Sequence, residues 1–129
     1  MDHVRDNPES EDLQLNAGTI LALTGRTDEA IGHFAEAVRL RPDDAEAHYK
    51  LGVALADRGR ASEALDQFQA VVQLRPDFWA AYVGLAQALH SLGRSAEAIS
   101  TLTGALRNRP DLAEARNLLD QYSGGRSQK

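Results

Sequence analysis

The sequence places all of its prolines at one fixed spacing. Four prolines follow one another at intervals of 34 residues, and they are Pro8, Pro42, Pro76 and Pro110. The same interval separates three glycines in the stretches between the prolines, which are Gly25, Gly59 and Gly93. A fixed period of this size is typical of a solenoid, in which one supersecondary unit is repeated and each unit packs on its neighbours. The period therefore constrains the fold more than any other feature of the chain.

Each period has the pattern of two amphipathic helices. In the second period, Ala47, Leu51 and Leu55 recur at four-residue steps, so a first helix has one apolar face. Gly59 ends this helix, because a left-handed residue is needed there. A second helix ends just before Pro76, since proline disfavours helix at the residue that precedes it. No strand is predicted, so we expect an all-α fold.

The period also sets the boundaries of the predicted units. We expect repeats at 11–44, 45–78 and 79–112, a capping helix at 113–122 and a flexible tail at 123–129. Residues 1–10 resemble the end of a unit, so they are interpreted as an N-terminal tail or as the remnant of a preceding repeat.

The residues beside the later prolines are predicted to stabilise helix ends. Arg41, Arg75 and Arg109 complement helix dipoles, and Asp43, Asp77 and Asp111 cap the helices that follow.

Composition and charge argue against several classes of function. The net charge of −5 argues against nucleic acid, which requires a basic surface. The chain has no cysteine, and its histidines, His3, His33, His48 and His90, lack the spacing of metal ligands. A glycine-rich phosphate loop and a G-x-S-x-G motif are also absent from the sequence. The acidic pair Glu11 and Asp12 is expected at an exposed helix start, where capping explains it better than catalysis. We therefore expect no catalytic site, no metal and no cofactor.

Two further features of composition concern location and self-association. The N-terminus is polar and no apolar run reaches 18 residues, so we expect a cytoplasmic protein that does not enter the membrane. Arginine greatly outnumbers lysine, which indicates a bacterial source.

The charge is unevenly distributed along the chain. Residues 1–44 carry ten acidic and four basic residues, whereas residues 79–129 carry four acidic and six basic residues. This asymmetry keeps weak head-to-tail self-association open as an alternative.

The repeated residues resemble those of the tetratricopeptide repeat family. The segments LTGRTDEAIGHFAEAVRLRPDDAEA and LADRGRASEALDQFQAVVQLRPDFWAA follow its pattern of a turn glycine, then alanine, an aromatic residue, alanine and proline. The resemblance covers residues 11 to about 112, and it departs from the pattern at Leu102, where an aromatic residue is usual. It implies three repeats and a capping helix in a right-handed superhelix, whose concave groove binds a segment of a protein partner.

The resemblance also indicates which residues line that groove, because the first helix of each repeat faces it. The positions carried over to this chain are Leu15, Thr19, Tyr49, Lys50, Val53, Asp57, Val83, Gln87, His90, Asn117 and Gln121. Among them, Leu15, Val53 and Val83 are expected to form a modest apolar strip on the groove surface. Tyr49 is the best single anchor, because a tyrosine ring buries a large area at a low entropic cost. An aromatic pair, Phe78 and Trp79, marks one junction between repeats and is either a local packing contact or a hot spot for binding.

One class of partner is argued against by the same resemblance. Family members that hold the acidic C-terminal tails of heat-shock chaperones use a clamp of lysine, asparagine and arginine side chains. The matching positions are Leu15, Thr19, Lys50, Ala80 and Gly84, and none of them carries the clamp residue. We therefore expect an adaptor that binds another type of peptide. The alternatives are a targeting module of a larger enzyme, such as a glycosyl- or sulfo-transferase, and a self-assembling structural unit.

Overall fold

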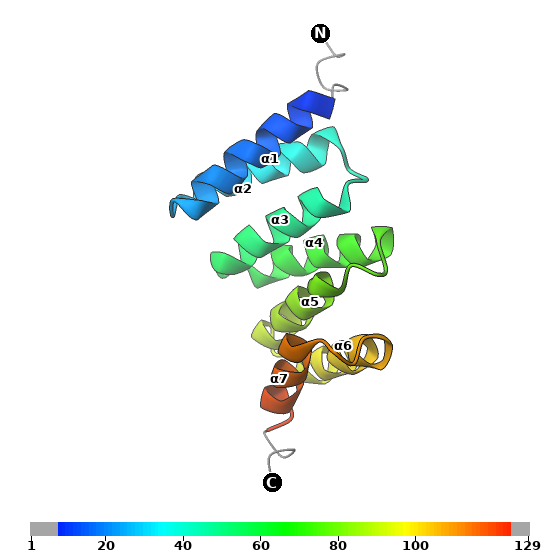
Figure 1. Cartoon of the computed structure of the whole chain (residues 1–129). Coiled ribbons are helices and arrows are strands. Elements are labelled where there is room, and N and C mark those ends of the chain that lie inside the picture. The colour runs from blue at the N-terminus through cyan, green and yellow to red at the C-terminus, as the bar shows by residue number, and fades with distance from the viewer. Residues whose placement is uncertain (1–7, 125–129) are drawn as a thin grey trace.

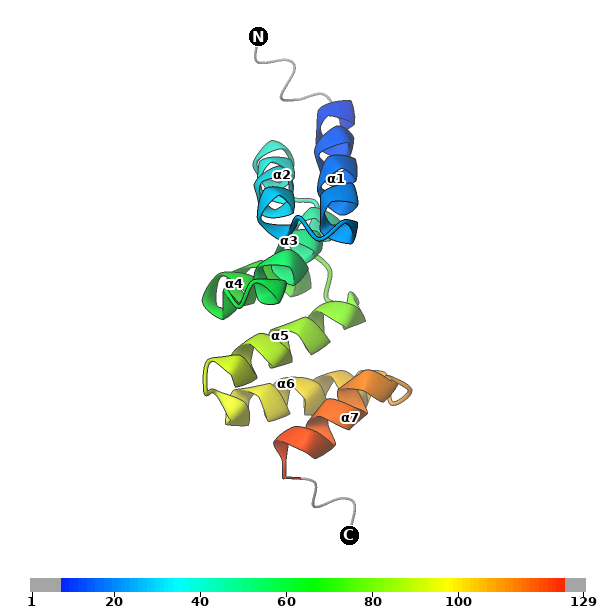
Figure 2. The ribbon, with the colours of Figure 1, turned by 90° about the vertical axis from the view of Figure 1, so that its left-hand side faces the viewer.

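Residues 8–124, the part of the chain that the computed structural model describes, form seven helices and no strand (Figure 1). The helices are α1 (Pro8–Leu23), α2 (Thr27–Leu40), α3 (Ala45–Asp57), α4 (Ala61–Leu74), α5 (Trp79–Ser91), α6 (Ser95–Asn108) and α7 (Ala113–Tyr122). Each helix packs against the next along the chain, and α1 and α7 lie at opposite ends of the stack. The direction of the helix pairs turns along the stack (Figure 2). The predicted all-α superhelix is therefore confirmed.

A tight turn joins the two helices of each repeat. Gly25, Gly59 and Gly93 have φ angles of +84°, +74° and +78°, the left-handed conformation that the sequence predicts there. In the first turn, the Arg26 N–H donates to the Leu21 carbonyl oxygen at 2.8 Å. This bond and that from Gly25 to Ala22 (3.2 Å) satisfy carbonyl groups at the end of α1. The same turn recurs with the same bonds after α3 and α5.

The loops between repeats differ from the prediction in one respect. The aspartates that follow the prolines do not cap the next helix. Each lies near the arginine two residues earlier, with Asp43 3.6 Å from Arg41, Asp77 3.6 Å from Arg75 and Asp111 2.9 Å from Arg109. Among α2 to α7, only α3 has a side-chain cap, in which Asp44 accepts from the Glu46 N–H at 3.0 Å. The prediction fails by one residue, because the N-cap positions are Asp44, Phe78 and Leu112, each directly after one of these aspartates.

The first helix begins earlier than the predicted first repeat. Pro8 is the first residue of α1, so residues 8–10 belong to this helix and not to a tail or a remnant. Proline suits this position, because its fixed φ matches the helix and the N–H that it lacks would have no partner inside the helix. The remaining tail predictions concern residues 1–7 and 125–129, which lie outside the described residues.

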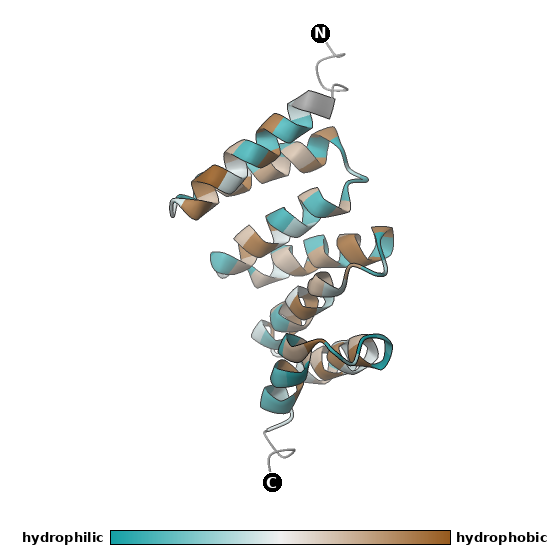
Figure 3. Cartoon of the chain, viewed as in Figure 1, coloured by the Kyte–Doolittle hydropathy of each residue, from teal (hydrophilic) through white to brown (hydrophobic). Residues whose placement is uncertain are grey.

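Glycine against phenylalanine allows the two helices of a pair to pack closely. A Cβ atom on Gly18 would lie 2.5 Å from the Phe34 ring, and a Cβ atom on Gly52 would lie 2.9 Å from the Phe68 ring. Such contacts are shorter than van der Waals separation, so only glycine fits without movement of the ring. Hydrophobic and polar residues alternate along the helices (Figure 3), as expected for helices that bury one face.

Candidate functional site

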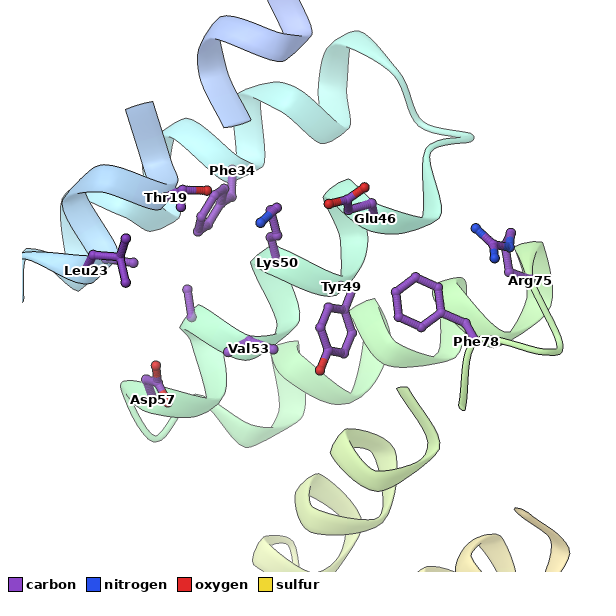
Figure 4. Close-up of a pocket in the computed structure, with 12 residues that line it drawn as sticks. Thr19, Leu23, Phe34, Glu46, Tyr49, Lys50, Val53, Asp57, Arg75 and Phe78 are labelled. Carbon is purple, nitrogen blue, oxygen red and sulfur yellow. The ribbon is translucent and has the colours of Figure 1, made fainter. Parts of the chain in front are cut away.

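A pocket of about 400 Å³ lies between α1 and α3 (Figure 4). It is lined by Thr19, Ala22, Leu23, Phe34, Glu46, Tyr49, Lys50, Val53, Ala54, Asp57, Arg75 and Phe78. The lining residues of α3 recur mostly at three- and four-residue steps, which places them on one side of that helix. Along the stack, α3 packs on α5 and α5 packs on α7, but α1 and α3 have no comparable contact. The pocket occupies the space between them.

Aromatic rings close the pocket at the junction of the second and third repeats. The centroid of the Tyr49 ring lies 5.0 Å from that of Phe78 and 5.8 Å from that of the buried Phe68. The guanidinium carbon of Arg75 lies 5.5 Å from the Phe78 centroid, which is a cation–π contact. Burial raises the pKa of Tyr49, and the charge of Glu114 raises this pKa further. The Tyr49 hydroxyl is therefore neutral at physiological pH and able to donate a hydrogen bond.

Four charged side chains line the pocket, and they differ in their partners. Glu46 and Asp57 are acidic, and Arg75 and Lys50 are basic. The Arg75 side chain has an ion pair with Asp77, at 3.6 Å. By contrast, Lys50 is half-buried and forms no ion pair with any residue in the described part of the chain. The Lys50 side chain projects from α3 into the space beside α1 (Figure 4), so the pocket contains an unpaired cation.

Two smaller hollows continue from the pocket toward α7. One has a volume of about 220 Å³, and its lining includes Tyr49, Val83, Gln87 and Glu114. The other has a volume of about 390 Å³, and its lining includes Asp57, Gln87, His90 and Tyr122. The His90 ring stacks on the Tyr122 ring with centroids 3.9 Å apart, and His90 Nδ1 lies 3.0 Å from the Ser95 hydroxyl. His90 is therefore held against the last helix.

The structure divides the predicted groove residues into three sets. The pocket brings together Thr19, Tyr49, Lys50, Val53, Asp57 and Phe78. The smaller hollows contain Val83, Gln87 and His90. Leu15 is half-buried and packs against the core. Val83 is buried, although it lines the same hollow as Tyr49 and Val53. Asn117 and Gln121 are exposed on α7 and line neither the pocket nor the two hollows.

Arg75 and Glu114 are among the residues of this region that were not predicted from the sequence. The repeat pattern assigns Arg75 to a helix dipole, and it places Glu114 on the polar face of the last helix. Arg75 reaches the pocket because the ring of Phe78, three residues later, attracts its guanidinium group. The signal in the sequence was that Phe78 replaces the polar Asp44 of the preceding junction. Glu114 has no such signal, because its position depends on how α7 crosses α5.

Trp79 lies apart from this pocket, although it follows Phe78 directly. Its ring lies 5.5 Å from the Tyr82 ring, and both line a separate cavity of about 570 Å³ between α5 and α6. In the earlier repeats, hydrogen-bonded pairs of 2.8 Å bridge the two helices at the equivalent positions, Gln14 with His33 and His48 with Gln67. In the third repeat the equivalent of Gln67 is Thr101, which is too short to form this bridge. Tyr82 keeps only the bond to the proline carbonyl oxygen, to Pro76 at 2.8 Å, a bond that His48 makes with Pro42.

A buried carboxyl group lies in the first turn of α1. Glu11 is 4% exposed, and its Oε2 atom has no hydrogen-bond partner among the described residues. Burial raises the pKa of Glu11 to about 7, the neighbouring Asp44 raises it as well, and Arg41 opposes the shift. The expectation that Glu11 is exposed at a helix start is therefore wrong. The equivalent residue of α3 is the buried Ala45, so this position is buried in both repeats.

The side chains of the described residues are arranged more for binding a molecule than for reacting with it. No group of three or more metal-binding side chains occurs within residues 8–124. In the same part of the chain, no helix is long and apolar enough to span a membrane. What the arrangement offers is a surface for non-covalent contact: an apolar pocket with aromatic walls, a neutral hydroxyl group and one unpaired cation.

Comparisons with known proteins agree with this architecture. The family model described as tetratricopeptide repeat matches residues 4–45, 15–77 and 49–113. The chain is similar to YrrB, described as a TPR protein with an unusual peptide-binding site, with 28% identity and a TM-score of 0.81 over 84% of this chain and 56% of YrrB. The first TPR of Spaghetti (RPAP3), solved with the HSP90 peptide SRMEEVD, is 20% identical with a TM-score of 0.87, over 95% of this chain and 97% of that one. MamA is 23% identical with a TM-score of 0.85, over 98% of this chain and 74% of MamA. No curated protein matches the sequence.

Proposed function

The chain belongs to the tetratricopeptide repeat family, and from this premise we propose that it is a non-catalytic module that binds a peptide segment of a protein partner. The proposed site is the pocket between α1 and α3, with the smaller hollows toward α7 as its extension. YrrB has a peptide-binding site, and its similarity to this chain supports the general function. The chain spans just over half of YrrB, 56%, so the partner is argued below from this chain's own residues.

The observation that carries the proposal is the pocket itself. Its volume of about 400 Å³ lies within the usual range for ligand sites and leaves room for a large apolar side chain of a bound peptide. Tyr49, Val53 and Phe78 provide apolar and aromatic contact for that side chain. Aromatic residues at the centre of a contact surface commonly contribute most of the binding energy.

The charges of the pocket define the neighbouring part of the peptide. Lys50 is half-buried and has no ion-pair partner among the described residues, so a carboxylate next to the apolar side chain would gain a charge-assisted bond. Glu46 and Asp57 disfavour a peptide with several acidic residues. The proposed ligand is therefore a segment with one large apolar residue beside a single acidic residue. This chemistry differs from that of the acidic chaperone tails, for which the clamp residues are missing.

The test begins with selection of peptides from a random-peptide display library on the purified 129-residue chain. The dissociation constant of a selected peptide is then measured by fluorescence polarisation. We expect Val53→Ser to weaken binding at least about tenfold, since it removes an apolar wall of the pocket. The matched control is Leu74→Ser, because Leu74 is 42% exposed, close to the 37% of Val53, and lies outside the pocket.

A second variant tests the proposed acidic residue of the ligand. Lys50→Gln is expected to weaken binding of a peptide that contains one carboxylate and to leave its neutral amide analogue unchanged. The proposal is contradicted if the Val53 and Leu74 variants bind the selected peptides equally well. Equal loss with both peptides in the Lys50 variant would contradict the assigned ligand chemistry only.

A further inference from the structure

An adjoining hollow of about 220 Å³ extends the pocket toward α7. It shares Tyr49, Val53 and Asp57 with the pocket, and these residues follow one another along α3 (Figure 4). Because the two cavities have walls in common, a peptide that fills the pocket can continue into the adjoining hollow. The kind of side chain that this hollow accepts is therefore a further determinant of the ligand, provided that the chain binds a peptide as proposed.

Small residues of α5 keep the adjoining hollow open. In the 34-residue register, Ala80 and Gly84 take the places that Glu46 and Lys50 occupy on α3. A Cβ atom on Gly84 would lie 2.6 Å from the Phe68 ring, which forms part of the wall. Glycine at this position therefore lets α5 approach the ring, and neither small residue fills the space beside it.

The charged side chains of the adjoining hollow are both acidic. Asp57 is the last residue of α3, Glu114 is the second residue of α7, and both side chains are exposed. Neither carboxylate has a hydrogen-bond or ion-pair partner within residues 8–124. The basic residues Lys50 and Arg75 line the pocket but not this hollow. Its negative charge is therefore not balanced by a basic residue of the lining.

The fold itself does not account for the acidic residue at position 57. The C-terminal end of a helix carries partial negative charge, so the helix dipole disfavours a carboxylate there. In the other repeats, Leu23 and Ser91 occupy the position of Asp57. Glu114 suits the first turn of α7, but its charge also raises the pKa of Tyr49 on the opposite wall. Both carboxylates therefore act on the space of the adjoining hollow.

A long basic side chain matches this combination of walls and charges. Its stem can pack along Val53 and Val83 while its charged end stays at the wet rim. There it gains charge-assisted bonds to Asp57 and Glu114, and the Gln87 amide oxygen can accept a further bond. An apolar side chain would leave both carboxylates without a partner, and an acidic one would be repelled. We propose that the adjoining hollow binds a lysine or arginine side chain of the peptide whose apolar residue fills the pocket.

This proposal gives the charges of the ligand an order along the groove. The acidic residue lies at Lys50 in the pocket, and the basic residue lies farther toward α7. Exchanging the two residues of the peptide would bring like charges together at both places, which costs affinity. The exchanged peptide has the same composition and net charge, so its general attraction to a chain of net charge −5 is the same. It is therefore the matched control for the order of the charges.

Peptides selected from a display library on the wild-type chain test the proposal, with dissociation constants measured by fluorescence polarisation. We expect selected peptides to contain a basic residue, and its replacement by the uncharged norleucine to weaken binding at least about tenfold. Exchange of the acidic and basic residues should weaken binding further. In a variant with both Asp57→Asn and Glu114→Gln, the norleucine replacement should change the constant by less than about twofold. Asp66→Asn, at an exposed acidic residue of α4 outside the hollow, should retain the full effect.

Two further measurements separate recognition from a structural role of the two carboxylates. Asp57→Asn should leave the melting temperature unchanged or raise it, because it removes a charge that opposes the helix dipole. A structural role predicts a lower melting temperature instead. Glu114→Lys should reverse the preference, so that a peptide with glutamate in place of the basic residue binds more tightly than the selected one.

The outcomes also separate this proposal from the proposed function on which it rests. Selected peptides that lose affinity for Val53→Ser but bind equally well with norleucine overturn the proposal, while peptide binding in the pocket stands. Selected peptides without a basic residue have the same consequence. Peptides that bind Val53→Ser as tightly as the wild type contradict binding in the pocket and this proposal with it. A wild-type chain that selects no peptide overturns both.

Discussion

The two ends of the superhelix differ in what they leave on the surface. At the C-terminal end, α7 carries Asn117 and Asp120 where α5 has the buried Val83 and Ala86. The free side of α7 is thus polar, and the last helix can end the stack in water. At the N-terminal end, α1 exposes Leu13 and two further large apolar residues and has no charge between residues 13 and 24. The first helix therefore has apolar surface available for another molecule.

The groove side also differs between the two ends. Near α7 the His90 ring stacks on Tyr122 at 3.9 Å, beside a hollow of about 390 Å³. Near α1 the pocket remains open between α1 and α3. One repeat period thus gives different groove surfaces at the two ends, because the residues outside the periodic core differ. Specific contacts are determined by those residues, whereas the shared core determines the fold.

The largest expected effect compares a leucine at each end. Leu102 is fully buried beneath the last helices, whereas Leu13 is exposed on α1. We expect Leu102→Ala to lower the free energy of unfolding by roughly 2–5 kcal/mol, because it leaves a cavity. Leu13→Ala should change it by less than about 0.5 kcal/mol. Urea unfolding at a dilute protein concentration measures both changes in the free energy of unfolding. Similar losses in the two variants would show that the two leucines are equally covered.

The second prediction concerns the buried Glu11 at the N-terminal end. Its pKa of about 7 in the folded chain lies above the ordinary value of 4.5. A raised folded-state pKa stabilises the fold below pH 4.5, and this contribution is lost as the pH rises through 7. Relative to Glu11→Gln, the wild type should therefore lose roughly 2–4 kcal/mol between pH 4.5 and pH 8. If the free energies of unfolding of the two proteins change with pH in parallel, the buried position of the Glu11 carboxyl group is contradicted.

The third prediction compares glycines near the two ends. A Cβ atom on Gly18 of α1 would meet the Phe34 ring at 2.5 Å, whereas one on Gly104 of α6 would meet nothing within 4 Å. Gly18→Ala is expected to lower the melting temperature, at a cost of about 1–3 kcal/mol from overpacking. Gly104→Ala should raise stability by about 0.5–1 kcal/mol, because alanine favours helix. If calorimetry shows that the two substitutions change the stability in opposite directions, α1 is closely packed on α2 although its outer face is open.

Much of the fold could be predicted because its determinants are local and recur. Gly59 indicates a turn, because glycine readily adopts a left-handed conformation. Pro76 indicates the end of a helix, because proline disfavours the helical conformation of the residue before it. The role of Asp77 could not be predicted in this way, because the repeat pattern does not fix the start of a helix to one residue, and the N-cap position is Phe78. Pro8 shows the same limit, since proline can either end a helix or begin one.

The site was predicted less completely, because it depends on contacts between repeats. Tyr49 and Val53 line the pocket, at positions that the family resemblance assigned to the groove. Val83, at the position equivalent to Tyr49, is buried because α5 packs directly on its neighbours α3 and α7. The spacing between α1 and α3 has no local signature, so the pocket became evident only with the structure.

The central claim is that the pocket between α1 and α3 binds a side chain of a peptide. The most direct test is a ¹H–¹⁵N NMR titration of the chain with a peptide selected from the display library. The account predicts the largest shifts at Thr19, Tyr49 and Val53, with small shifts at Asn117 and Gln121 on α7. Largest shifts around Trp79 between α5 and α6, or along α7, would contradict it.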